Sequence, residues 1–576
     1  MILQALAKYY SERLSLPAGY QKKAIPFLIE LDDAGLFAGL IDTRSGEGKS
    51  KRARNCLVPR EVKRSGSKAW EKANILWDNP AYVLGISSKD VENAKRKHDS
   101  FTKQFHLAFP HKSIDRGIEA VGVFLNSGDY TKIISDPIWP EILESDGYLS
   151  FKMVNDDRLV CERQTVIDAL NSTCSDKKNI YQSVCLVSGE EDEVAQLHNA
   201  IKGVRGAQTS GANIVSFNLS AFTSFGKEQG FNAPVGKKAE FAYVTALNVL
   251  LDKDSRQKVQ VGDATTVFWA EREHDMEGWF ADFFGEPPKG TSIQDCAGFK
   301  ALIESPKTGA LPILDDKTRF YVLGLAPNAS RIAIRFWYQG SVGEVAGHMR
   351  QHFEDISIVH GPKDPEYLSL FRLLVSTAMQ NKTENIPPNI AGDFMKAILA
   401  GTPYPKTLLS SAIRRCRAEQ NVNYARAALI KAILTRETRY RKIHLKEVGM
   451  SLDTSNTNPG YLLGRLFAVL ERAQEQASPG INATIRDRFY GAASSTPVAV
   501  FAHLMKLKNH HIAKIDNKGA AINLEKQIGE IVDKLGVADA FPPHLPLDDQ
   551  GRFAVGYYHQ RQSFFTKKSD DNTKEA

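Results

Sequence analysis

The sequence contains no apolar run long enough to cross a membrane. Its longer apolar segments, such as FAYVTALNVLL (241–251), fall well short of the roughly 18 to 20 residues that a membrane-spanning helix needs. The first residues, MILQALAKYYSERL, place no basic leader ahead of an apolar core, and their leucines have the spacing of an amphipathic helix. We therefore expect neither a membrane span nor a signal peptide.

Cysteine is also scarce. The 576 residues include six cysteines, which are scattered without a Cys-x-x-Cys pair. A disulfide framework and a structural zinc site both need more regular cysteine spacing. The pattern is typical of a protein from a reducing compartment, and we expect this one to be cytoplasmic.

The segment DTRSGEGKSKRARN (42–55) comes close to a nucleotide-binding P-loop without matching it. The motif requires a glycine separated by four residues from Gly48-Lys49-Ser50, at the position that Thr43 occupies. A helix should follow to direct its N-terminus at the phosphate, but basic residues come next and Pro59 is close behind. A P-loop NTPase is therefore only an alternative interpretation.

Other catalytic signals are weak. His348 and His352 are four residues apart, as two zinc ligands on one helix would be, but HMRQH lacks the glutamate of a zincin. His274 and Asp275 resemble the HD pair of metal-dependent phosphohydrolases without the remaining ligands. We predict no catalytic residue, no metal and no cofactor, and keep an HD-type nuclease as a second enzymatic alternative.

Positive charge is concentrated in two clusters, although the net charge of the chain is only +7. Residues 44–72 contain ten basic and three acidic side chains, and residues 411–446 contain ten basic and two acidic ones. The remainder of the chain is acidic overall. Local basic patches on a mildly acidic protein favour a polyanionic partner, although solvated loops and helix faces produce similar runs.

The hydrophobic patterns predict an α+β fold in three regions. Residues 1–180 mix amphipathic helices with strands, residues 181–365 are rich in strands, and residues 366–576 repeat apolar residues at helical spacing. The third region is predicted to be a helical bundle. In the first region the predicted strands are AIPFLIEL (24–31), GLFAGLI (35–41) and AYVLGI (81–86).

A series of distinctive blocks runs in order along nearly the whole chain. They are MILQALAKYY, VPREVKRSG followed by DNPAYVLG, SFNLSAFTSFGKEQGFNAPVG, VGDATTVFWA, YQGSVGEV, YLLGRLFAVLERAQ and GYYHQR. Together they resemble the large subunit of the type I-C CRISPR Cascade surveillance complex.

The resemblance implies a subunit without enzymatic activity. Such a protein assembles with crRNA, a repeated backbone subunit, a crRNA-capping subunit and a small subunit. It recognises the protospacer-adjacent motif in target double-stranded DNA, supports R-loop formation and helps to recruit a helicase-nuclease. In complexes of this kind base pairing reads the sequence, while protein reads a short duplex motif and the backbone. A general RNA-binding assembly protein is a further alternative.

Candidate DNA-binding residues follow from charge, polarity and the resemblance. The resemblance places motif recognition on the basic loop, where Lys and Arg can neutralise phosphates and polar side chains can read base edges. The candidates there are Lys49, Lys51, Arg52, Arg54, Lys63, Arg64, Ser65, Lys68, Lys72, Asn74 and Asn79. The polar central block adds Asn218, Ser224, Gln229 and Asn232, unless it is turn-rich packing. The second cluster adds Arg415, Arg426, Lys431, Arg439, Arg441 and Lys442.

Met450 is a candidate internal start. Relatives in the resembled family commonly encode their small subunit by internal translation of the same gene. Met450 precedes the YLLGRLFAVLERAQ segment, and residues 450–576 are enough for a small helical bundle that resembles such a module. We expect Met450 or a nearby codon to begin a second product.

Overall fold

The computed structural model describes most of the 576 residues. The described ranges are 1–17, 19–46, 51–62, 64, 68–110, 115–173, 181–285, 316–442, 448–536 and 540–565. Within these ranges no helix combines the length and the apolar character that crossing a bilayer requires.

The chain forms two compact units. The first contains residues 1–200 and 215–247, and the second contains residues 201–214 and 248–576. Both mix helices and strands, so the predicted α+β class is confirmed. The units do not coincide with the three predicted regions, because the middle region contributes to both.

A four-stranded mixed sheet organises the first unit, with its strands in the order β3-β2-β6-β5. The strands are β2 (Phe27–Leu31), β3 (Phe37–Asp42), β5 (Trp77–Asp78) and β6 (Leu149–Met153). β2 pairs parallel to β6, and a parallel pair needs a long crossover connection, which the helices between them provide. β2 is almost entirely buried, as expected from its apolar sequence FLIEL.

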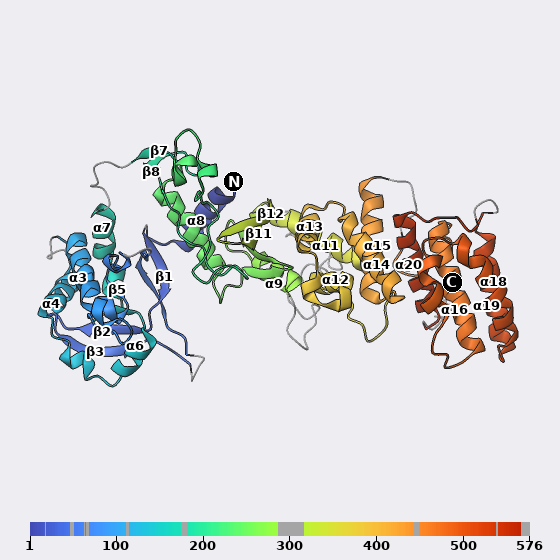
Figure 1. Cartoon of the computed structure of the whole chain (residues 1–576), viewed down its shortest axis with the longest axis horizontal. Helices are drawn as coiled ribbons and strands as arrows, with labels where there is room; N and C mark the ends of the chain where they lie inside the picture. The colour runs from blue at the N-terminus through green and yellow to red at the C-terminus, as the bar shows by residue number, and fades with distance from the viewer. Residues whose placement is uncertain are drawn as a thin grey trace, which may run out of the picture. The chain divides into compact units, whose positions relative to one another are not determined.

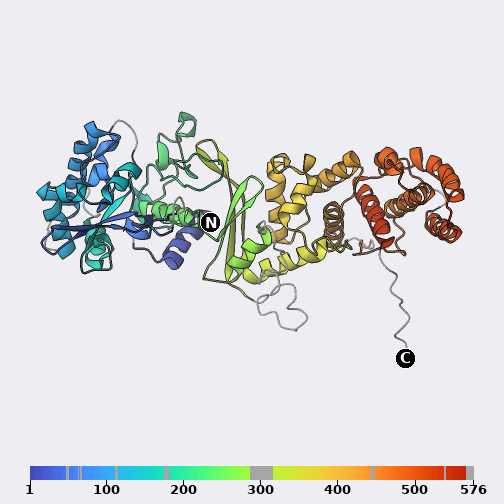
Figure 2. The same ribbon diagram turned by 90° about the horizontal axis from the view of Figure 1, so that it is seen from below.

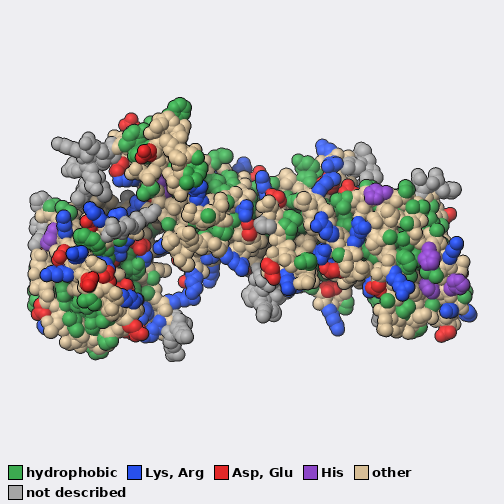
Figure 3. All heavy atoms as spheres, viewed as in Figure 1, with side chains coloured by type: hydrophobic (Ala, Val, Ile, Leu, Met, Phe, Trp, Pro, Cys, Tyr) green, Lys and Arg blue, Asp and Glu red, His purple; other side chains and the backbone are tan. Residues whose placement is uncertain are grey.

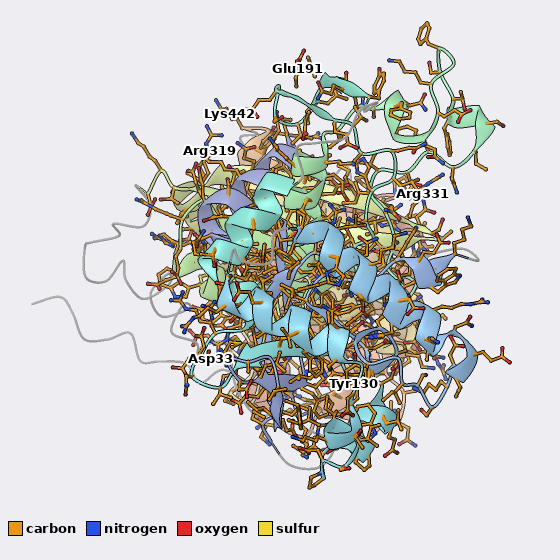
Figure 4. All side chains as sticks on the ribbon, turned by 90° about the vertical axis from the view of Figure 1, so that its left-hand side faces the viewer. Asp33, Tyr130, Glu191, Arg319, Arg331 and Lys442 are labelled. Carbon is orange, nitrogen blue, oxygen red and sulfur yellow. The ribbon has the colours of Figure 1, made fainter. Side chains whose placement is uncertain are left out.

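Helices pack around this sheet (Figure 1). They are α2 (Pro80–Val83), α3 (Val91–Ala108), α4 (Arg116–Ser127), α5 (Thr131–Ile134), α6 (Trp139–Ser145) and α7 (Gln164–Thr173). Phe101 of α3 and Phe124 of α4 both pack on Phe151 of β6, with ring centroids 6.5 and 5.8 Å apart. Figure 4 looks onto this layer of helices, with Tyr130 labelled.

The first unit also contains smaller elements. They are α1 (Ile2–Tyr9), η1 (Tyr10–Leu14), β1 (Tyr20–Ala24), β4 (Asn55–Pro59), η3 (Ala69–Glu71), η5 (Val160–Glu162), β7 (Gln182–Val184), β8 (Glu191–Glu193), η6 (Ser220–Phe222), η7 (Gln229–Asn232) and most of α8 (Lys237–Leu250). β1 and β4 form a separate two-stranded antiparallel ribbon, as do β7 and β8.

The strand prediction for AYVLGI is wrong, because this segment contains helix α2. Asn79 precedes the helix, and its side chain accepts a hydrogen bond from the Tyr82 backbone N–H at 3.4 Å. Pro80 occupies the first helical position, where its fixed φ and missing N–H are both tolerated. The predicted strands at 24–31 and 35–41 correspond to β2 and β3.

The second unit begins with an antiparallel sheet in the order β12-β11-β10-β9. The strands are β9 (Lys258–Val261), β10 (Ala264–Ala270), β11 (Arg319–Asn328) and β12 (Arg331–Ser341). Phe268, Phe320 and Phe336 lie in one hydrophobic core with residues of helices α9 (Met276–Phe284) and α11 (Val342–Ile356).

Beyond this sheet the second unit is helical, as predicted (Figures 1 and 2, yellow to red). The remaining helices are α12 (Leu370–Thr377), α13 (Pro388–Ala400), α14 (Lys406–Glu419), α15 (Tyr424–Tyr440), α16 (Pro459–Ala477), α17 (Ile485–Ala493), α18 (Val498–Ala513), α19 (Lys518–Asp533) and α20 (Leu547–Ser563). A single hydrophobic core continues from the sheet to α20.

Glycines allow α16 and α20 to approach closely. A Cβ added at Gly464 of α16 would lie 2.1 Å from the Phe553 carbonyl oxygen, and one at Gly556 of α20 would lie 2.3 Å from the Tyr461 carbonyl oxygen. Real Cβ atoms do not come this close to backbone. The pair is therefore a tightly packed centre for the helices that follow Met450.

Candidate nucleic-acid interface

The first basic cluster begins on a hairpin that extends from the β1–β4 ribbon. Ser45 and Arg52 pair through two backbone hydrogen bonds of 2.9 Å, just before β4 begins. Thr43 fixes the base of this hairpin, because its hydroxyl donates to the Ile25 carbonyl at 2.5 Å and accepts the Arg54 N–H at 3.3 Å. The residue that departs from the P-loop motif is thus part of a hairpin.

The structure also gives no P-loop helix after the Gly-Lys-Ser end. Residues 51–59 form the bridge at Arg52 and the strand β4. An extended chain cannot direct a helix N-terminus at a phosphate, so the geometry of a P-loop is absent from these residues. Lys49 itself lies outside the described residues.

Lys51, Arg52 and Arg54 are exposed on this hairpin, which carries grouped Lys and Arg side chains (Figure 3). Lys51 is 3.9 Å from a Glu141 carboxylate oxygen, a distance at which an exposed pair contributes little. Arg44 differs from these three, because it is mostly buried and bonds the carboxylates of Asp42 and Glu141. The hairpin therefore presents three of its predicted cations to solvent.

The second half of the basic loop is held to the domain by a buried carboxylate. Asp78 is fully buried and pairs with the Arg64 guanidinium, and it also accepts the backbone N–H groups of Asn74 and Asn79, both at 2.9 Å. Burial raises the pKa of Asp78, and the Arg64 charge opposes that shift. Arg64 further donates to the Lys72 carbonyl at 2.7 Å and lies 4.0 Å from the Tyr82 ring centre.

Asn74 also helps to hold this half of the basic loop in place. It is fully buried, and its side-chain oxygen accepts the Val62 N–H at 2.8 Å. Asn79 caps α2 and donates to Asp146 at 3.3 Å. In this structure Asn74 cannot reach a base edge, so we correct its predicted role from base reader to loop anchor; Arg64 also acts mainly as an anchor.

Lys68 and Lys72 are the described cations of this half-loop that are exposed to solvent, and Glu71 between them is exposed as well. They flank the short helix η3, whose backbone is held by two further bonds. Tyr82 donates its hydroxyl to the Ala69 carbonyl at 3.1 Å, and Ser100 donates to the Glu71 carbonyl at 2.7 Å. Lys63 and Ser65 lie outside the described residues. Sequence reasoning missed exposed Arg96 of α3, which lies 6.0 Å from the Trp70 ring centre beside η3.

The central polar block folds as turns and the short helices η6 and η7. Asn218 and Ser224 are exposed, whereas Gln229 and Asn232 are partly buried. Asn232 bonds Ser224 and the carbonyls of Lys227 and Gln229, so it shapes the segment. Of the four candidates, Asn218 and Ser224 are thus the exposed ones.

Three cations of the second basic cluster, Arg426, Lys431 and Arg436, are buried. Arg426 is fully buried and donates to the carbonyls of Ser376 and Asn421 and to the Glu419 carboxylate. Lys431 is 4% exposed, and its ammonium group donates to the carbonyls of Glu354, Asp355 and Ser357 at 3.4, 3.0 and 2.8 Å. These carbonyls lie at the C-terminal end of α11, where a positive charge is favourable. Both residues are therefore corrected from DNA contacts to internal ligands of the fold.

Other cations of this cluster are paired with carboxylates. Arg436, which is buried, and Arg439 bond the two oxygens of buried Asp355 at 2.8 and 2.7 Å. Arg441 pairs with Glu437, and Arg415 is 3.8 Å from Glu419. Lys442, labelled in Figure 4, is exposed. Arg414, Arg417, Arg439 and Arg441 are also exposed, so part of this cluster still faces solvent.

The histidine candidates also have structural partners. His348 bonds the Leu399 carbonyl at 2.6 Å, and buried His352 bonds the Tyr404 hydroxyl at 2.7 Å. Burial lowers the pKa of His352 to about 3, so the ring is neutral at pH 7. His274 bonds Asp316 and the Met276 N–H at the start of α9. Among the described residues no three His, Cys, Asp or Glu side chains are grouped to hold a metal.

The fold and the exposed basic surface define a mixed α+β protein with a candidate nucleic-acid interface in its first unit. A family model described as CRISPR-associated protein (Cas_Csd1) matches residues 5–565. The chain belongs to this family of CRISPR-associated proteins. No curated protein matches the chain.

The internal role of Lys431 leads to a stability prediction. Replacing Lys431 with Met should lower the free energy of unfolding by about 2 to 4 kcal/mol, because the carbonyls at the end of α11 lose their donor inside the protein. Lys526, which is exposed on α19, provides a matched control. Lys526→Met should change the free energy of unfolding by less than about 0.5 kcal/mol in a urea titration. Equal effects of the two substitutions would contradict the assigned role.

Proposed function

We propose that the chain is the non-catalytic large subunit of a type I-C CRISPR Cascade complex in the cytoplasm. In this role it recognises the protospacer-adjacent motif in target double-stranded DNA, supports R-loop formation and helps to recruit the helicase-nuclease. Its partners are crRNA, the repeated backbone subunit, the crRNA-capping subunit and the small subunit. Membership of the CRISPR-associated family and the resemblance of the sequence blocks support this assignment.

The anchored basic loop of the first unit is the observation that carries the proposal. Its flanks are fixed by Asp78, Asn74, Tyr82 and Ser100, while Lys68 and Lys72 point to solvent. Cations on a rigid base lose little freedom on binding, so they can hold a duplex in a defined register. Lysine contacts to phosphate position a protein on DNA, and groups near them can then read base edges.

The hairpin of Lys51, Arg52 and Arg54 extends the basic surface. These side chains suit the sequence-independent part of the interaction, because each cation that neutralises a phosphate releases condensed counterions. A subunit that reads a short motif needs both parts, namely backbone contacts for affinity and a few local contacts for selectivity.

Binding of the assembled complex to duplexes with randomised bases beside the target tests this function. The wild-type complex should enrich a short flanking motif. Joint replacement of Lys68 and Lys72 with Ala should weaken binding about 5- to 50-fold, because two phosphate or base contacts are lost. Lys132→Ala, at an exposed position on α5, is the matched control and should leave both affinity and enrichment unchanged.

Two outcomes would contradict the proposal. A wild-type complex that enriches no flanking motif would argue against motif recognition by this subunit. Normal affinity and enrichment after loss of Lys68 and Lys72 would show that this loop does not recognise the motif. Binding to RNA with no preference for duplex DNA would instead favour a general RNA-binding assembly protein.

The helices after Met450 suit a second product. Met450 is exposed, and the following helices have their own tightly packed centre where α16 meets α20. In the full chain α20 also packs on α14 and α15, as the contacts of Gly551 with Ile430 and Leu409 indicate. A product that begins at Met450 would expose this surface of α20, and we propose that it binds within the complex as the small subunit.

Changing the Met450 codon tests this proposal. An in-frame substitution such as Met450→Leu, made with a leucine codon that does not initiate translation, should leave the full chain intact, because the side chain is exposed, and should abolish a band of the size of residues 450–576. Immunoblotting with an antibody to the C-terminal helices measures both products. Persistence of the smaller band after Met450 and any nearby non-ATG codons are changed would rule out internal initiation.

A further inference from the structure

A glycine-rich loop of the second unit, KGVRGAQTSG (202–211), carries positive charge that is not paired within the described part of the chain. Lys202 and Arg205 are exposed, and neither forms an ion pair with a described residue. The loop itself contains no Asp or Glu. Arg426 and Lys431 of α15 differ, because internal groups bind their charges. Exposed and unpaired cations can act on an external anion.

The base of this loop is closed by two backbone hydrogen bonds. The Ile201 N–H donates to the Ala212 carbonyl at 2.8 Å, and the Ala212 N–H donates to the Ile201 carbonyl at 3.0 Å. Next to the base, a Cβ added at Gly203 would lie 2.5 Å from the Leu251 carbonyl oxygen. Only a glycine allows this close approach, and its φ of 89° is also one that glycine adopts readily.

The backbone of both cationic residues is fixed as well. The Lys202 N–H donates to the Asn248 side-chain oxygen at 2.8 Å, and the Arg205 N–H donates to the Thr265 hydroxyl at 3.0 Å. Val204 between them is buried. The two cations therefore project from a braced backbone, and cations on such a backbone lose little freedom when they bind a ligand.

The outer part of the loop adds further hydrogen-bond donors. The backbone N–H groups of Gly206, Thr209 and Ser210 have no partner among the residues that the structure describes. Thr209 and Ser210 also carry exposed hydroxyl groups. Backbone amides, hydroxyls and cations are the groups that proteins use to bind phosphate oxygens.

The loop lies beside the turn that joins β11 to β12. A Cβ added at Gly206 would lie 3.3 Å from the Pro327 side chain, and the Asn213 N–H donates to the Ser330 carbonyl at 3.4 Å. Ser330 is exposed, and Arg331, labelled in Figure 4, is partly buried. The turn sequence PNASR has no acidic residue. Loop and turn together form a polar surface without a carboxylate of their own.

This surface suits a nucleic-acid phosphate better than a protein. The exposed side chains of the loop are polar, so it presents no apolar anchor of the kind that dominates protein interfaces. The adjoining turn at 252–256 contains two acidic and two basic residues, so it does not cancel the charge of the loop. The chain also belongs to a family of CRISPR-associated proteins. A chain of phosphates can meet two cations that lie three residues apart.

We propose that loop 202–211 holds the sugar–phosphate backbone of a nucleic acid in the complex, with Lys202 and Arg205 each contacting a phosphate. This inference rests on the proposed assembly with crRNA and target DNA, and it adds a contact surface in the second unit. Both nucleic acids offer the same phosphodiester chemistry, so the test separates them. Counting basic runs misses this loop, because two cations among ten residues form no run.

The test removes single phosphate charges and single sets of cations in the assembled complex. Neutral methylphosphonate linkages are placed one at a time in the crRNA or in the target strands. Joint replacement of Lys202 and Arg205 with Gln removes both cations of the loop. Joint replacement of Lys363 and Lys382 with Gln removes the same charge at two other exposed positions of the second unit and is the matched control. Thr209→Glu places a negative charge on the loop and keeps both cations.

The crRNA series measures the affinity of the large subunit for the crRNA-bound subunits, and the DNA series measures the affinity of the complex for the target duplex. Wild type and the control should lose affinity at one or two linkages of one nucleic acid, which identifies the phosphates that the loop contacts. The Lys202 and Arg205 double variant should bind that nucleic acid about 5- to 50-fold more weakly and should be insensitive to the same linkages. Thr209→Glu should weaken binding in the same series.

Three results would contradict the inference. Equal sensitivity of the double variant and the wild type at every linkage would overturn it while leaving the proposed function intact. Weaker assembly of the double variant with unchanged sensitivity to the linkages would show a protein-docking loop and would also overturn it. Failure of the wild-type chain to assemble with crRNA and to bind the duplex would refute the proposed function and this inference with it.

Discussion

A cation can leave water only when other groups replace its hydration, and this constraint separates the buried from the exposed cations of the two basic clusters. In the second unit, Lys431, Arg426 and Arg436 are buried, and backbone carbonyls and carboxylates surround their charged groups. In the first unit, the buried group is a carboxylate, Asp78, and a single Arg64 pairs with it. The lysines near that pair, Lys68 and Lys72, remain exposed to solvent.

This difference determines what each cation can do. The charges of Arg426, Lys431 and Arg436 are bound by internal partners, so they stabilise the second unit and offer little to a ligand. Other cations of the same cluster remain exposed, namely Arg414, Arg417, Arg439, Arg441 and Lys442. The loop anchored by Asp78 has the opposite organisation, since its buried groups fix the backbone and its exposed cations remain available. A protein that must hold a duplex in register needs such a fixed base, and the proposed reading of a short DNA motif depends on it.

The sequence predicts the fold better than it predicts the site. Long periodic segments such as 91–109 and the helices after 366 were predictable because a helix buries one face at regular spacing. The buried cations of α15 were not, although the run AALIKAIL around Lys431 is apolar on all sides, which is a signal of an enclosed helix. The apolar run AYVLGI favours a strand, but Asn79 and Pro80 before it provide the cap and first position of a helix. The burial of Asn74 depends on partners that are distant in the sequence, and the exposure of Phe225 depends on the conformation of its turn. A local sequence pattern predicts neither.

The salt dependence of DNA binding tests most directly the claim that exposed charge in the first unit forms the interface. Joint replacement of Lys51, Arg52 and Arg54 with Gln in the assembled complex removes three exposed cations of the hairpin. The slope of log affinity against log salt should then become shallower by roughly 1 to 3, since each lost phosphate contact accounts for about 0.9. A slope equal to that of the wild-type complex would contradict the account and would place the interface elsewhere on the chain.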